Sequence, residues 1–119
     1  MLAHCGDTTD LAYLEELAAS GALLGMDRFG LDVLLPFEER VATVVAMCKR
    51  GHAGSMVVSH DAMGFTDWFP PGLREQIAPN WHFLHVTQDV LPELGRRGVS
   101  DEQIKQMQQE NPRRFFAAD

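Results

Sequence analysis

The sequence is poor in cysteine, and its two thiols lack the spacing of a disulfide framework. Among 119 residues only Cys5 and Cys48 are cysteines, and neither belongs to a C-x-x-C motif. Small secreted domains that depend on disulfides carry several cysteines at short intervals, whereas isolated cysteines are typical of reducing compartments. We therefore expect two free thiols and a cytoplasmic protein.

Long apolar runs and an excess of basic residues are also missing. No stretch approaches the roughly 18 apolar residues of a membrane span, and the first residues lack the basic start and apolar run of a signal peptide. Ten basic against 17 acidic side chains give a formal charge of −7, which repels phosphate backbones and anionic lipid. These absences argue against nucleic acid and membrane partners and favour a small-molecule role.

The residues that are present indicate a folded domain of alternating strands and helices. Apolar residues make up 45% of the chain, enough for a core of modest size. The sequence predicts strands over 23–26 and 56–59, and helices over 10–20, 36–49, 90–96 and from 100 onward. Residues 81–86 could form a short strand or an irregular return. Alternation of this kind predicts an α/β fold with a parallel sheet.

Several helix ends carry recognisable capping residues. Thr8 or Thr9 can cap the first helix, and Pro36 can occupy the first position of the second, where its missing N–H costs nothing. Gly51 follows two cations at the end of that second helix, as a helix C-terminus favours. Ser100 and Gln103 have the spacing of a capping box before the last helical stretch.

Both predicted strands end in polar residues. Asp27 and Arg28 follow the first, and the apolar run 56–58 leads into Ser59-His60-Asp61. In barrels of alternating strands and helices, reactive side chains lie where the strands end, so Asp61 is the first candidate for chemistry. From its position alone it could also be a helix cap or a partner in a surface ion pair. His60 must point to the opposite face if Asp61 points into a site, and we interpret it as structural.

The loop over 62–79 is long and rich in aromatic residues. It contains Phe65, Trp68, Phe69 and the Pro70-Pro71 pair. Long loops after strand ends often form binding surfaces. Phe65 and Trp68 could equally be core residues beneath the loop, and the sequence leaves both alternatives open.

Four motifs occur in a fixed order along the chain. They are His4-Cys5-Gly6-Asp7-Thr8, Gly25-Met26-Asp27-Arg28-Phe29-Gly30-Leu31-Asp32, Ser59-His60-Asp61 and Asn111-Pro112-Arg113-Arg114-Phe115-Phe116. Together they resemble the C-terminal part of the phosphotriesterase family, and in particular its lactonase-like members, within the amidohydrolase superfamily. The resemblance covers essentially the whole chain.

This resemblance implies a partial (β/α)8 barrel, with residues 1–119 as a single partial domain that supplies about strands six to eight with their helices. It implies two divalent metal ions, expected to be zinc, at the mouth of the barrel. A bridging hydroxide would attack a small-molecule ester, lactone or phosphotriester.

The resemblance also assigns roles to individual residues. His4 and Asp61 match metal ligands, and Asp61 would also take the proton of the attacking hydroxide. Arg28 and Asp7 match the path that leads this proton away. Arg28, Trp68 and Phe65 are the residues expected to meet the substrate.

The sequence also departs from the family pattern. Ala3 stands where a glycine commonly precedes the histidine, and Thr9 replaces an acidic residue. The His-x-His of strand one, the bridging modified lysine of strand four and the histidine of strand five have no counterpart. A catalytic zinc site needs at least three protein ligands, and the family pattern gives this chain two.

Two hypotheses of different class follow from this shortage of ligands. In the first, the chain belongs to a zinc-dependent hydrolase, as a fragment, a truncated reading frame with Met1 inside strand six, or one part of a split barrel. Its partner would then be a complementing N-terminal half, and a homo-oligomer is a further possibility. In the second, the chain is a non-catalytic remnant or an interaction module. Either way, we expect the isolated chain to bind zinc weakly and to be inactive.

Overall fold

The structure is a computed structural model that describes residues 1–117. Its centre is a pair of parallel strands, β1 (Leu24–Met26) and β2 (Met56–Val58), in the register Leu24↔Met56, Gly25↔Val57 and Met26↔Val58. Leu2 joins the other edge of β1 through a parallel bridge to Leu24. The prediction of a parallel arrangement is confirmed.

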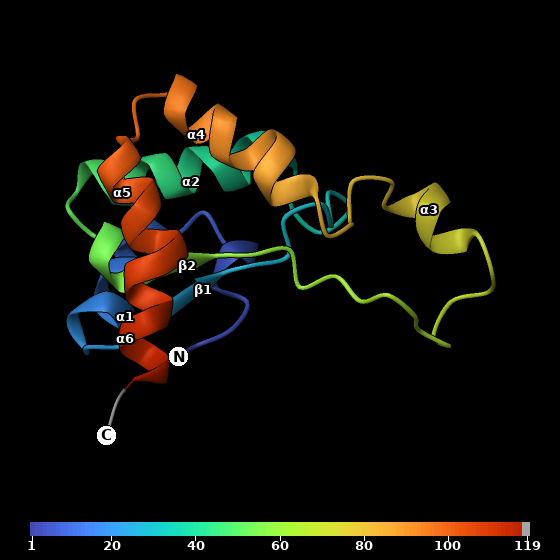
Figure 1. Ribbon diagram of the computed structural model, residues 1–119, viewed down its shortest axis with the longest axis horizontal. Coiled ribbons are helices and arrows are strands. Elements are labelled where there is room, and N and C mark those ends of the chain that lie inside the picture. Colours follow the sequence, from blue (N-terminus) through green and yellow to red (C-terminus); the bar gives the residue numbers. More distant parts are fainter. Residues whose placement is uncertain (118–119) are drawn as a thin grey trace.

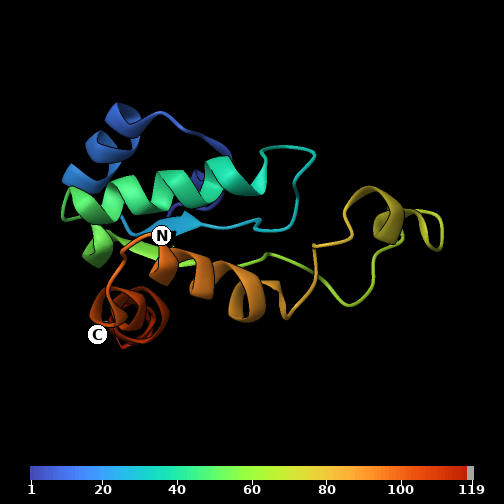
Figure 2. The same ribbon diagram turned by 90° about the horizontal axis from the view of Figure 1, so that it is seen from above.

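Helices pack around these strands and share one hydrophobic core with them. Figure 2 shows α1 (Leu11–Ala19), α2 (Phe37–Lys49) and α4 (Leu91–Arg96) one beside the next, with the C-terminal helix seen end-on. Each contributes apolar side chains to one continuous cluster with the strands. Its fully buried members include Leu14, Leu24, Met26, Val41, Val44, Met47, Met56, Val90, Leu94 and Met107.

Two capping assignments from the sequence are wrong by one or two residues. Asp10, not Thr8 or Thr9, is the N-cap of α1, because its carboxylate accepts a hydrogen bond from the Tyr13 N–H at 3.0 Å. Pro36 is the N-cap of α2 and lies just before its first residue. The end of α2 is as expected, with Lys49 in the last turn and Gly51 at φ 87°, a conformation that glycine adopts without strain.

The C-terminal part is more continuously helical than expected. A π-helical turn, η3 (Val86–Val90), runs directly into α4. The predicted Ser100–Gln103 capping box is present and starts α5 (Asp101–Lys105), which continues through a second π-turn, η4 (Gln106–Glu110), into α6 (Asn111–Phe116). The possible strand over 81–86 is not formed: backbone hydrogen bonds from His82 to Asn80 and from His85 to His82 make turns there.

The C-terminal helix also covers the outer edge of β2. The side-chain amide of Gln108 donates to the Val58 carbonyl at 2.9 Å, and that of Asn111 donates to the Met56 carbonyl at 2.7 Å. These amides pair with carbonyl groups that have no partner in β1. An unpaired buried carbonyl is costly, so the two contacts stabilise this edge of β2.

The segment after β2 extends away from the helical body (Figure 1). The sequence analysis predicts only a loop over 62–79, but the structure places a short helix there, α3 (Leu73–Ile77). Two further single turns, η1 (Cys5–Asp7) and η2 (Ala53–Ser55), lie before β1 and before β2. Over residues 1–117, no helix is long and apolar enough to cross a membrane.

Candidate functional site

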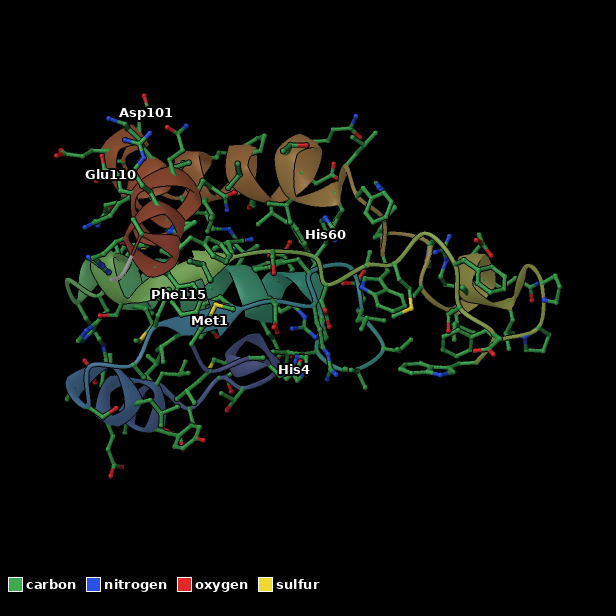
Figure 3. All side chains as sticks on the ribbon, turned by 60° about the horizontal axis from the view of Figure 1, so that its bottom comes forward. Met1, His4, His60, Asp101, Glu110 and Phe115 are labelled. Atoms are coloured by element: carbon green, nitrogen blue, oxygen red, sulfur yellow. The ribbon has the colours of Figure 1, made fainter. Side chains whose placement is uncertain are left out.

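The polar residues that follow the strands meet at one end of the sheet. His4 comes two residues after the Leu2 bridge, Arg28 two residues after β1, and Asp61 three residues after β2. Parallel strands bring their carboxyl ends to one edge, which is where sites form on folds of this type. Figure 3 shows His4 and His60 toward the end from which the long loop departs, while Met1 and Phe115 lie farther from that end.

These residues share an unusual backbone conformation. Within residues 1–117, the non-glycine residues with positive φ are His4 at 62°, Arg28 at 61° and Asp61 at 51°. The left-handed region is sparsely populated by residues with a side chain, and such residues concentrate at functional sites. Each strand therefore ends in a sharp turn that redirects a polar side chain toward the other two.

The three side chains form a compact network. Arg28 Nη2 lies 3.2 Å from His4 Nε2, and Arg28 Nε lies 3.5 Å from Asp61 Oδ2. His4 Nδ1 is 3.9 Å from the same Asp61 oxygen. The structure thus brings together His4, Arg28 and Asp61, which are 57 positions apart at the extremes.

Asp7 joins the network from η1. Its Oδ2 accepts a hydrogen bond from Arg28 Nη1 at 2.8 Å. Partial burial of Arg28 opposes its charge, but hydrogen bonds and ion pairs with Asp7 and then Asp61 outweigh this and raise the pKa of the guanidinium. Arg28 is therefore a permanent cation between two carboxylates, well suited to orient Asp61 and unable to accept a proton.

Sequence reasoning missed Asp27 as a member of the site. Its carboxylate accepts from the His4 backbone N–H at 3.0 Å and lies 3.3 Å from His4 Nδ1. From the sequence, Asp27 beside Arg28 looks like a surface ion pair, yet in the structure the two side chains contact opposite ring nitrogens of His4. A carboxylate on a histidine ring nitrogen fixes the ring orientation and the tautomer, as is common for metal-ligating histidines.

Arg40 is the second residue that sequence reasoning missed. Its side chain is 0% exposed, and its Nη2 lies 2.8 Å from Asp7 Oδ1. It follows Glu38 and Glu39 at the start of α2, in a stretch that looks like a solvent-exposed helix face. The available signal was its spacing: position 40 lies one and four residues from Val41 and Val44 and so borders the apolar face.

His60 has the structural surroundings that the sequence analysis expects. Its Nδ1 accepts from the Ala62 N–H at 2.8 Å, and its carbonyl accepts from the Trp81 indole N–H at 2.7 Å. The ring packs against Phe83 with centroids 5.3 Å apart. Burial lowers the pKa of His60; the charge of Asp61 opposes this shift, and nearby histidines add to it.

The aromatic residues expected at the substrate lie elsewhere. Phe65 is 84% exposed and Trp68 is 77% exposed, both on the segment that extends away from the sheet (Figure 1). The alternative that they are core residues is therefore wrong. Phe65 lines a hollow of about 620 Å³ together with Phe69, Pro70 and Arg74, within the loop itself. In residues 1–117 the structure does not bring Phe65 or Trp68 into contact with the His4, Arg28 and Asp61 network.

The site residues fit part of a metal centre. An imidazole nitrogen and a carboxylate oxygen are donors that zinc prefers, and His4 and Asp61 offer one of each. Because His4 Nδ1 faces Asp27 at 3.3 Å, the nitrogen left for a metal is Nε2, which lies 3.2 Å from Arg28 Nη2 in this structure. The hydrogen bonds of His4 to Asp27 are the outer contacts such a ligand needs. Within the part of the chain that the structure describes, however, no group of three or more His, Cys, Asp or Glu could hold a metal ion.

Fold and site together define the class: an α/β protein that gathers histidine, arginine and carboxylate side chains at the carboxyl ends of parallel strands, as β/α-barrel enzymes do. The sequence model of the phosphotriesterase family matches residues 1–116, and the chain belongs to this family.

Similar proteins agree with this assignment. A phosphotriesterase homology protein of Mycobacterium tuberculosis is 54% identical over 116 residues, which cover 98% of this chain and 36% of that protein. An aryldialkylphosphatase of Saccharolobus solfataricus is 34% identical over 119 residues, covering 98% of this chain and 38% of its own length. The chain therefore spans little more than a third of the relatives it matches.

Solved structures agree as well. The structure of the phosphotriesterase from Mycobacterium tuberculosis superposes with a TM-score of 0.95 at 55% identity, over 97% of this chain and 36% of that one. The organophosphorus hydrolase from Deinococcus radiodurans gives a TM-score of 0.84 at 34% identity, over 97% of this chain and 36% of that one.

Proposed function

We propose that the chain forms about strands six to eight of a (β/α)8 barrel and supplies one side of the active site of a metal-dependent hydrolase. The observation that carries this proposal is the convergence of His4, Arg28 and Asp61, each in a left-handed backbone conformation, at one end of the parallel strands. The names of the relatives support phosphotriesters as substrates. Carboxylic esters and lactones are the other members of the proposed substrate class.

His4 and Asp61 are the proposed metal ligands, with zinc as the proposed ion. A bound divalent metal would supply a Lewis acid and a nucleophile at neutral pH. Asp61 Oδ2 is the proposed proton acceptor. Arg28, which keeps its proton, holds this oxygen at 3.5 Å through Nε and is anchored on Asp7 at 2.8 Å. Because Arg28 stays protonated, it does not itself accept the proton that leaves Asp61.

We further propose that this 119-residue chain has no hydrolase activity by itself. Two proposed ligands fall short of the three that a catalytic zinc needs. The remaining ligands would come from a polypeptide that carries the other strands. The shortage of donors also favours the second candidate, a non-catalytic interaction module, if no such polypeptide is present.

A chimera separates the two candidates. The segment of the Mycobacterium tuberculosis relative that matches this chain would be replaced by the chain itself, since 54% identity over 116 residues makes the exchange conservative. We expect zinc-dependent hydrolysis of an aryl phosphotriester or a lactone by the chimera, and none by the 119-residue chain alone. Asp61→Asn should abolish turnover, whereas Asp101→Asn, an exposed position in α5, should leave it unchanged.

Two outcomes would contradict the proposal. The first is a folded, zinc-loaded chimera that hydrolyses neither substrate, which would favour the interaction module. The second is turnover that survives Asp61→Asn, which would remove Asp61 from the chemistry.

A further inference from the structure

We propose that Arg40 is a positioning residue that holds Arg28 against Asp61 by acting through Asp7. This inference rests on the proposed function for its meaning, because it concerns how the catalytic carboxylate is oriented. Neither the family motifs in the sequence nor the proposed metal ligands include Arg40.

The first observation is the complete burial of a permanent charge. The Arg40 side chain is 0% exposed, although Arg40 is only the fourth residue of α2. Burying a guanidinium is costly unless it is paired and hydrogen-bonded, and arginine does not escape this cost by losing its proton. A position that keeps arginine under these conditions needs compensating partners close by.

Those partners are the segments that carry the site. Arg40 Nη1 donates to the Gly6 carbonyl at 2.7 Å and to the Asp27 carbonyl at 3.1 Å, and Nε donates to the Leu35 carbonyl at 3.0 Å. Gly6 lies in η1 beside Asp7, and Asp27 precedes Arg28. One guanidinium therefore fastens the turn that carries Asp7 to the turn that carries Arg28.

The backbones of these two turns approach each other closely. A Cβ atom at Gly6 would lie 2.5 Å from the Asp27 carbonyl oxygen. With the backbones in contact, the separation of Asp7 from Arg28 is set by the groups that hold the turns, and Arg40 is bonded to both.

The carboxylate of Asp7 connects the two arginines. Arg40 Nη2 forms an ion pair with Asp7 Oδ1 at 2.8 Å, and because Nε and Nη1 are held by backbone carbonyls, the planar guanidinium fixes where this charge lies. Arg28 Nη1 donates to Asp7 Oδ2 at 2.8 Å. With one oxygen held by Arg40, the other presents a fixed acceptor to Arg28, whose Nε is then directed at Asp61.

The experiment measures hydrogen exchange at the Arg28 Nε–H by NMR in the 119-residue chain, without metal or substrate. Arg40→Lys keeps the charge but loses the planar fork, so we expect exchange at Arg28 to become about tenfold faster, the effect of losing one net hydrogen bond. Amide exchange in β1 and β2 should not change. In an Asp7→Asn background, Arg40→Lys should have no further effect, because the connection is already broken.

Arg50→Lys is the matched control, since it alters an arginine–carboxylate pair with Glu15 far from the site. It should leave Arg28 exchange unchanged. The proposal is overturned if Arg40→Lys leaves Arg28 unchanged, if it exposes the strand amides as well, which would make Arg40 a general fold residue, or if its effect persists in the Asp7→Asn background. Because no readout involves hydrolysis, failure of the proposed function would not alter this result, and the reverse also holds.

Discussion

At the scale of single residues, the site consists of ion pairs between side chains that lie on turns with positive φ. Asp61 and Asp7 each face Arg28, and Asp27 holds His4 from the other side. Positive φ at a residue with a side chain costs on the order of 1 kcal/mol or more, which the surrounding contacts must offset. The hydrogen bonds of Arg40 to the Gly6 and Asp27 carbonyls are among these contacts, and they join two of the turns directly.

Gly6→Ala should destabilise the fold at this point. The added Cβ would lie 2.5 Å from the Asp27 carbonyl oxygen and 2.9 Å from its nitrogen, so one turn must move. We expect a loss of about 1–3 kcal/mol in the free energy of unfolding, measured by urea denaturation. Gly95→Ala, at an exposed helical position with nothing within 4 Å, should instead stabilise by about 0.5–1 kcal/mol. Equal stability of the Gly6→Ala and unmodified chains would mean that the turns are not in contact.

The two cysteines should be inert in the folded chain. Both are free, as expected from the sequence, and both are buried, and burial raises the pKa of Cys48 to about 11. Burial, followed by the charge of Asp27, also raises the pKa of Cys5. Because the thiolate is the reactive form, an aromatic disulfide reagent at pH 8 should label neither cysteine in the folded chain and both in urea. Rapid labelling without urea would contradict the packing around α2 and η1.

At the scale of elements, helix ends and strand ends are where local sequence and tertiary contacts meet. The Ser100–Gln103 box and the apolar strand 56–58 could be predicted because both depend on neighbouring residues. Arg40 could not, because its burial depends on carbonyl groups from two other segments. The short α3 was missed for a related reason: its N-cap is Gly72 with positive φ, after a turn in which the Leu73 N–H donates to the Pro70 carbonyl, within a stretch rich in loop-forming residues.

The end of α4 should show a pH dependence with a defined sign. Hydrogen bonds from Arg96 and then Arg97 lower the pKa of Glu93 from 4.5 to about 2. A carboxyl group with a lowered pKa in the folded state adds stability above its unfolded pKa, and that stability is lost as pH falls from about 4.5 toward 2. The free energy of unfolding, measured across this pH range, should therefore fall more steeply for the unmodified chain than for Glu93→Gln. Added salt should shrink the difference because Arg96, the first partner of Glu93, is exposed. If the free energy of unfolding fell equally with pH in both proteins, the ion pairs of Glu93 would contribute nothing.

At the scale of the whole molecule, the chain has one continuous hydrophobic core and carries the proposed site at the carboxyl ends of its strands. The matched residues make up 36% of the length of the Mycobacterium tuberculosis relative. A closed barrel typically needs roughly 250 residues, more than this chain has. The parallel α/β core and the strand-end position of Asp61 were predictable because they follow the period and polarity of the sequence. The contacts that connect His4, Asp27 and Arg28 depend on how two turns fit together, which no local pattern encodes.

Zinc should stabilise the 119-residue chain very little. Two donors give weak binding, and ligand binding raises stability only when the ligand concentration exceeds its dissociation constant. We expect the thermal unfolding midpoint to be unchanged by one equivalent of zinc, with a chelator-treated sample as control. A large upward shift would show that the chain alone forms a complete metal site.

The most direct test of the central claim is the position of zinc in crystals of the chimera with the Mycobacterium tuberculosis relative, located by anomalous diffraction at the zinc absorption edge. We predict anomalous peaks at coordinating distance, about 2.0–2.2 Å, from a His4 ring nitrogen and an Asp61 carboxylate oxygen, with Arg28 turned toward Asp61. Zinc bound away from both residues, in a chimera that hydrolyses its substrate, would contradict the assignment of this chain's strand-end cluster to the metal site.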